Sequence, residues 1–148
     1  MMRLPLVALA LSAGLAAADD PAAKKLLKDL EGTYATVSMT QGGQPAPDEA
    51  LKAASFVIRG ETFIVRHTKG GKSEDKAATV VVDPDQKPTA IDLTPKDGPD
   101  AGKPMLGIAK AEKDTLTLCF PDSPGGARPK DFTPAKGSEV MVIVLKKK

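Results

Sequence analysis

The chain has 148 residues, of which 27% are charged, with 21 lysines and arginines against 19 aspartates and glutamates and a formal net charge of +2. The two signs are mixed along the chain and form no basic stripe, so we expect neither nucleic acid nor an anionic membrane surface as a partner. The single cysteine, Cys119, cannot form an internal disulfide, so burial of apolar surface has to stabilise the fold.

The N-terminal segment predicts a signal peptide covering residues 1–18. A short basic start, Met1–Arg3, precedes the apolar run Leu4–Ala18, which ends in an alanine cleavage signal. This run is shorter than the roughly 20 apolar residues of a membrane-spanning helix. Asp19 stands where a lipoprotein would need a cysteine, so no membrane anchor is expected. We therefore expect a single exported domain, residues 19–148, in the periplasm or outside the cell.

A short amphipathic helix is predicted directly after the signal peptide. Pro21 suits the first helical position, Gly32 follows the last turn, and Leu26, Leu27 and Leu30 share one face. Strand patterns follow, with one helical turn at 48–54 before the second of them. The expected strands in the first half are 33–40, 55–59, 62–67 and 76–83.

The stretch 91–120 predicts a β-meander, because three apolar runs alternate with two turns rich in Gly, Pro and Asp. A loop rich in Pro and Gly follows, and a last apolar strand begins at Val140. About eight strands joined by hairpins indicate either an antiparallel sandwich or an up-and-down β-barrel with a short N-terminal helix. The barrel is favoured because closure leaves no exposed edges.

Alternation within these strands predicts which side chains point into the barrel. An eight-stranded barrel is either filled by such side chains or holds one small ligand. The aromatic content of 3% favours smaller side chains and some space inside. The residues expected to point inward are Phe56, Ile58, Phe63, Val65, Ile91, Leu93, Leu106, Ile108, Leu116, Leu118 and Phe120.

Several short motifs along the mature chain carry a resemblance to a known family. They are Leu30–Tyr34, Gly43–Pro47, Ala90–Pro95, Asp97–Pro99, Leu106–Ile108, Asp114–Phe120, Arg128–Pro129 and Phe132. Together they resemble a family of small exported proteins of planctomycete bacteria, which is described as lipocalin-like and has no established function. The resemblance implies a lipocalin-like barrel. Such barrels carry Gly-x-Trp at the first strand. This chain has no Trp, so the resemblance implies that Tyr34 closes the barrel beneath the helix.

The residues with reactive side chains predict neither catalysis nor metal binding. His67, the only histidine, is either a polar contact for a ligand at the barrel mouth or a strand-end residue in water, and the second interpretation is favoured. Cys119 lies opposite the Leu116, Leu118 and Phe120 face, and no motif brings a base to it, so a small hydrophobic role is favoured. The pattern contains no serine-nucleophile motif, zinc pattern or calcium loop, and no cofactor is expected.

Three functional hypotheses follow from these observations. The first is a carrier or sensor that binds a small apolar molecule inside the barrel. Its expected ligand-binding residues are Tyr34, Phe56, Phe63, Val65, His67, Leu106 and Leu118. The second is a structural or protein-interaction module with a packed interior, which uses the loop Pro121–Pro134 as its contact surface. The third is an enzyme of unrecognised type, which would have to depend on His67 or Cys119.

Overall fold

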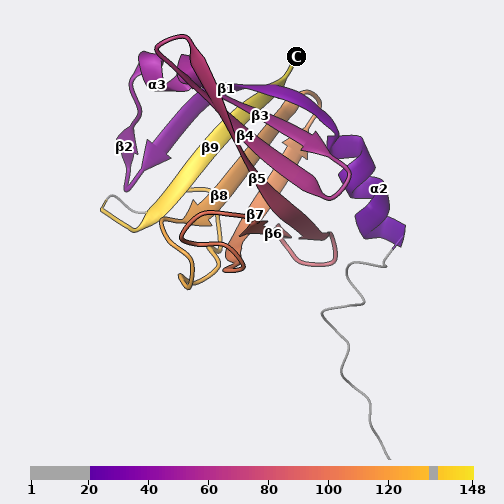
Figure 1. The fold of residues 1–148 in the computed structure, drawn as a ribbon. Coiled ribbons are helices and arrows are strands. Elements are labelled where there is room, and N and C mark those ends of the chain that lie inside the picture. Colours follow the sequence, from indigo (N-terminus) through magenta and orange to yellow (C-terminus); the bar gives the residue numbers. More distant parts are fainter. Residues whose placement is uncertain (1–20, 134–136) are drawn as a thin grey trace, which may run out of the picture.

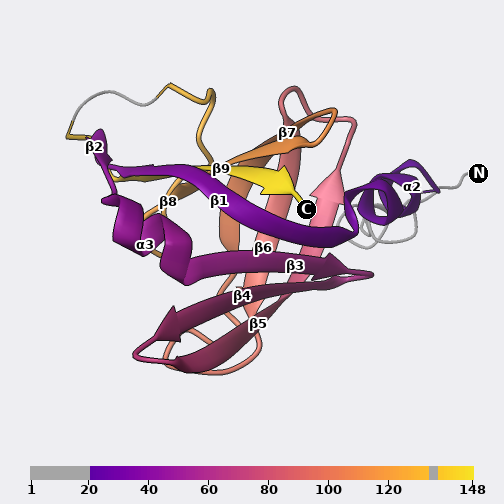
Figure 2. The same ribbon diagram turned by 90° about the horizontal axis from the view of Figure 1, so that it is seen from above.

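The computed structural model describes residues 21–133 and 137–148. Eight antiparallel strands close into one barrel, in which neighbouring strands follow chain order and the last strand pairs with the first (Figure 1, Figure 2). The predicted up-and-down barrel is therefore confirmed. Its strands are β1 (Gly32–Gln41), β3 (Ala54–Arg59), β4 (Thr62–Lys69), β5 (Lys72–Asp83), β6 (Thr89–Pro95), β7 (Met105–Glu112), β8 (Thr115–Pro121) and β9 (Val140–Lys147).

Two helices and one short strand accompany the barrel. Helix α2 (Pro21–Leu30) lies at one end, and α3 (Asp48–Ala53) lies near the opposite end (Figure 1). Strand β2 (Gln44–Pro45) pairs only with the end of β1. The predicted signal peptide lies outside the described residues. Within the described part of the chain, neither helix is long and apolar enough to cross a membrane.

A β-bulge in β1 changes the direction of its side chains halfway along the strand. Thr36 pairs with Leu145 and Ser38 pairs with Val144, so Val37 is an extra residue without an opposite partner. Val37 points outward and is 51% exposed. Because the bulge adds one residue, Met39 joins the side chains that pack against the core.

The barrel interior is filled by apolar side chains from every barrel strand. They pack as one cluster together with the inner face of α2. Of the residues predicted to point inward, Val65 and Leu93 are half-buried at the edge of this cluster. The predicted residues within the cluster are Phe56, Ile58, Phe63, Ile91, Leu116, Leu118 and Phe120.

The prediction that Leu106 and Ile108 point inward is wrong. The β6–β7 register puts Met105 and Gly107 on the interior face, and therefore Leu106 and Ile108 on the outer face. The reason lies at Gly107, where the ring of Phe120 occupies the space of a side chain. A Cβ on Gly107 would lie only 2.4 Å from two carbons of that ring. The larger residues of β7 suggest the opposite phase of alternation, but Gly107 is the residue that packs inside.

The outward direction of Ile108 is explained by residues 122–133, which we call the strap. The strap crosses the outer face of β6, β7 and β8 and is held there by Arg128. Arg128 Nη1 donates one hydrogen bond to Asp92 Oδ1 and another to the carbonyl oxygen of Gly107, both at 2.8 Å. A charged hydrogen bond of this kind is stronger than one between neutral groups.

A second contact fixes the far part of the strap and completes a cover over the barrel wall. The ammonium group of Lys110 lies 5.3 Å from the centre of the Phe132 ring, a cation–π distance. Ala90, Ile108 and Cys119 are buried although none of them belongs to the interior cluster. The strap therefore creates a second, smaller apolar layer outside the barrel.

Candidate functional site

One end of the barrel is covered by α2. Leu26 and Leu27 of the helix pack against the core, and Leu30 belongs to it. Beneath the helix, the Tyr34 side chain is 2% exposed, and its hydroxyl donates a 2.6 Å hydrogen bond to the carbonyl oxygen of Leu30. Burial raises the pKa of Tyr34, which keeps the hydroxyl protonated and available as a donor. Tyr34 thus lies where the resemblance to lipocalin-like barrels implies.

The middle of the barrel is occupied by side chains that were expected to contact a ligand. Phe56, Phe63 and Leu118 all belong to the core cluster and are at most 3% exposed. The rings of Phe56 and Phe63 lie 5.6 Å apart between centroids and are tilted by 51°, a favourable aromatic arrangement. These three residues contribute packing, so a ligand-accessible surface has to be sought at the barrel ends.

The end opposite α2 is lined by half-buried apolar side chains from five different strands. They are Met39 of β1, Val65 of β4, Leu93 of β6, Met105 of β7 and Met141 of β9. All five pack against the core on their inner side and remain partly accessible to solvent. We call these five residues the mouth ring.

Polar side chains continue the interior face beyond the mouth ring. In the strand register, Lys76 lies opposite Val65, and Glu74 lies opposite His67. All three polar residues are exposed. His67 therefore lies at the barrel mouth and is exposed to solvent. This position is compatible with a polar contact for a ligand and with a strand-end residue in water. Leu106, by contrast, lies on the outer wall and away from the mouth ring.

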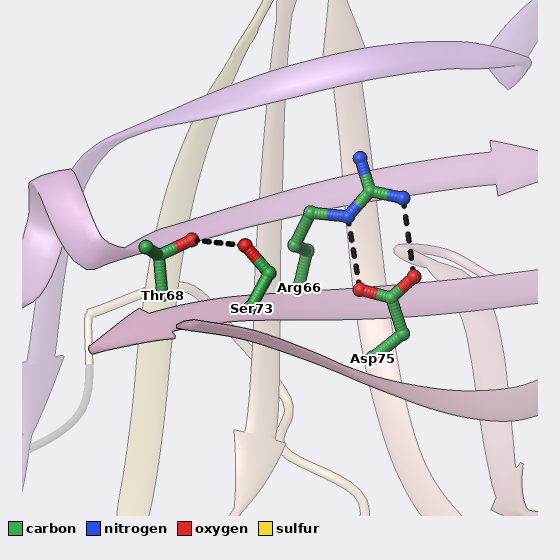
Figure 3. A network of polar contacts seen from close by, with 4 residues as sticks. All are labelled: Arg66, Thr68, Ser73 and Asp75. Atoms are coloured by element: carbon green, nitrogen blue, oxygen red, sulfur yellow. Dashed lines mark hydrogen bonds and ion pairs between the residues drawn. The ribbon is translucent and has the colours of Figure 1, made fainter. Parts of the chain in front are cut away.

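The projecting β4–β5 hairpin beside the mouth is held by polar contacts on its outer face (Figure 3). Arg66 binds Asp75 through two hydrogen bonds, of 2.9 and 3.1 Å, and Thr68 lies 3.0 Å from Ser73 between hydroxyl oxygens. The hydrogen bond from Arg66 lowers the pKa of the Asp75 carboxyl group. Both members of this ion pair are about half exposed, so the contact orders the hairpin and adds little stability.

Cys119 is buried beneath the strap and is unsuited to nucleophilic chemistry. Its exposure is 0%, and burial, with a smaller effect of the Asp131 charge, raises its pKa to about 11. A thiol with this pKa is protonated at neutral pH, whereas the thiolate is the reactive form. His67 lies at the mouth on the inner face and Cys119 on the outer wall, so the structure does not bring the two together. Among the described residues, no group of three or more His, Cys, Asp or Glu could hold a metal ion.

Sequence reasoning missed the three methionines of the mouth ring. Met39 was hidden by the bulge at Val37, which the alternation in β1 does not reveal. Met105 was excluded by the incorrect orientation of β7, and Met141 lies in a continuous apolar run that has no alternation to read.

No protein-family model, no curated protein and no solved structure matches this chain. The class of protein is therefore defined by the fold itself, which is an eight-stranded antiparallel barrel of the lipocalin-like type with one end covered by a helix.

Proposed function

We propose that this protein is an exported carrier or sensor that binds a small apolar molecule at the mouth ring. The observation that carries the proposal is the ring itself, five half-buried apolar side chains at the uncovered end of a closed barrel. Barrel mouths are frequent ligand sites, and such sites are mostly apolar with a few polar groups. His67 and Lys76 supply the polar groups here.

The composition of the ring supports binding without a preformed deep cavity. Methionine is unbranched and polarizable, so it adapts to the shape of a bound molecule better than leucine or valine does. Three of the five ring residues are methionines. The packed middle of the barrel limits the depth of entry, so a ligand held at the ring remains partly exposed to solvent.

A substitution pair tests this proposal. Met105→Lys places a charge in the ring, where the long side chain reaches water without unfolding the barrel. Removing one methionine contact costs about 1.5–3 kcal/mol, so the affinity for an apolar fluorescent probe such as N-phenylnaphthylamine should fall at least tenfold. Val37→Lys is the matched control, because Val37 is an exposed apolar residue on the outer wall.

Equal probe affinity in wild type and Met105→Lys, with both proteins folded by circular dichroism, would contradict the proposal. Native mass spectrometry of protein purified from its own source without detergent is the complementary measurement. An extra mass present only in the native spectrum supports the proposal and gives the mass of the bound molecule.

The second candidate function is a protein-interaction module, and the packed interior favours it. In this hypothesis the contact surface is the loop 121–134, of which residues 121–133 are described and lie along the barrel wall. A variant with alanine in place of the exposed Lys130 and Asp131 should then fail to capture a partner protein that the wild type captures. Equal capture by both proteins argues against the loop as the contact surface.

Export and membership of the planctomycete lipocalin-like family are part of the same proposal. The predicted cleavage gives a chain that begins at Asp19, which N-terminal sequencing of the protein from its own source can test. A chain that still begins at Met1 would contradict export through this segment.

A further inference from the structure

The covered end of the barrel contains a small cleft that is separate from the mouth ring. Helix α2 packs chiefly against β3 and β5, on one side of the barrel end (Figure 2). Between the other side of the helix and the β7–β8 turn, a cleft of about 180 Å³ remains. A single water molecule needs only about 10–15 Å³ on such a measure, so the cleft is large enough for a small organic molecule.

The floor of the cleft is apolar. It is formed by Leu30 of α2, Tyr34 of β1 and Leu116 of β8, each at most 4% exposed. Leu26 on the helix and Ala111 on β7 also line the cleft. A short aliphatic chain placed here would contact carbon atoms of these residues.

A positive charge lies at the rim of the cleft, against the apolar floor. The ammonium group of Lys147 donates a 3.1 Å hydrogen bond to the carbonyl oxygen of Asp29, and it lies 5.7 Å from the centre of the Tyr34 ring. Both partners are neutral groups. An ammonium group has three N–H donors, and in the described part of the chain Lys147 forms no ion pair.

Three further charged residues line the cleft beside Lys147. These residues are Lys113, Asp29 and Asp114. Lys113, Asp29 and Asp114 are exposed and hydrated, whereas Lys147 is half-buried. A carboxylate therefore gains most from Lys147, the least exposed of these four charged residues.

We propose that this cleft binds a short-chain monocarboxylate, with the carboxylate on Lys147 and the aliphatic chain on Leu30 and Leu116. Butanoate, a carboxylate with a three-carbon chain, is a suitable probe for a cleft of this size. The carboxylate takes the two unused ammonium donors, and the chain displaces water from apolar surface. The site is distinct from the mouth ring because Tyr34 and the packed core lie between them.

A titration with butanoate tests the proposal by two-dimensional amide NMR of the full chain. We expect saturable shifts that are largest for Leu30, Tyr34 and Leu116, and at least tenfold weaker binding of butanamide, which has the same size without the charge. Lys147→Met should weaken butanoate binding at least tenfold. Lys146→Met is the matched control, since the neighbouring lysine is exposed and is not part of this cleft, and it should leave the affinity unchanged.

Ala111→Leu provides an independent test that keeps every charge and fills the cleft with carbon. It should abolish the butanoate shifts even if Lys147→Met disturbs the end of β9. Unchanged binding in Ala111→Leu, or equal shifts with butanoate and chloride, would overturn the proposal. Met105→Lys should bind butanoate like wild type, so failure of the mouth-ring hypothesis and failure of this one give different results.

Discussion

Arg128 is the residue on which the attachment of the strap depends most directly, and its replacement gives a sharp test of the fold. In Arg128→Gln the two 2.8 Å hydrogen bonds to Asp92 and to the Gly107 carbonyl oxygen are lost. We expect the strap to detach more often while the barrel remains closed, because the core cluster contains no strap residue.

The magnitude follows from the burial of the ion pair. A hydrogen bond to a charged group contributes about 1.5–3 kcal/mol, whereas a fully exposed ion pair contributes at most about 1 kcal/mol. The side chains of Arg128 and Asp92 are 33% and 32% exposed, so an intermediate loss of about 1–2 kcal/mol is expected. Such a loss raises the equilibrium constant for strap opening about 5- to 30-fold.

Cys119 reports this opening, because it is the only thiol and lies beneath the strap with 0% exposure. When opening is fast relative to labelling, the rate of reaction with a maleimide is proportional to the population of the open form. Labelling of Arg128→Gln should therefore be about 5- to 30-fold faster than that of wild type, at denaturant concentrations far below global unfolding.

Arg66→Gln is the matched control for this experiment. It removes the arginine–aspartate pair of the β4–β5 hairpin, which contains no strap residue (Figure 3). Labelling in this variant should stay at the wild-type rate. A wild-type rate in Arg128→Gln, or an equal increase in both variants, would refute the idea that Arg128 holds a local cover over the thiol.

Three further predictions concern the core and the pH dependence of stability. Gly107→Ala places a methyl group within 2.4 Å of the Phe120 ring and should lower the unfolding free energy by about 1–3 kcal/mol, measured by urea denaturation. Tyr34→Phe loses the hydrogen bond to Leu30 and leaves a carbonyl oxygen unpaired, which should cost about 1–2 kcal/mol in the same assay. The raised pKa of Cys119, about 11 in the folded protein, means that the unfolded state releases its proton first as pH rises. Stability should thus fall between about pH 9 and 11, and Cys119→Ala should show a smaller fall, whereas equal curves would contradict the assigned burial.

The sequence was sufficient for the barrel architecture because each barrel strand and both helices had a local signal. Gly60 and the Gly70–Gly71 pair mark hairpin turns, and in the structure all three have positive φ in the turns that join β3, β4 and β5. The amphipathic pattern of α2 specified the face that packs on the core. Each of these signals lies within a few neighbouring residues, so it can be recognised in one sequence without knowledge of the tertiary contacts.

The side-chain directions in β7 and β1 could not be predicted, because they depend on contacts between distant residues. In the β7 sequence, either set of alternating side chains could point into the barrel. Which set does so depends on the Phe120 ring over Gly107 and on the strap that covers Ile108. A loop rich in Pro and Gly gives no indication that it will shield an apolar wall. Both faces of β7 carry apolar residues because the inner face packs in the core and the outer face packs under the strap. Strand alternation alone would predict apolar residues on one face only.

The packed middle of the barrel has a functional consequence for both ends. Between the mouth ring and the cleft under α2 lie the rings of Tyr34, Phe56 and Phe63, which are held by direct packing within one cluster. A molecule passing through the barrel would have to displace these rings, at a cost comparable to removing large core side chains. The two ends are thus separate surfaces. A ligand affects a distant site only if it binds two conformations of the protein with different affinities. Binding at one end of the barrel could therefore affect the other end only if the core had two alternative packings. The packed rings of Phe56 and Phe63 therefore form a wall that would keep the two proposed sites independent.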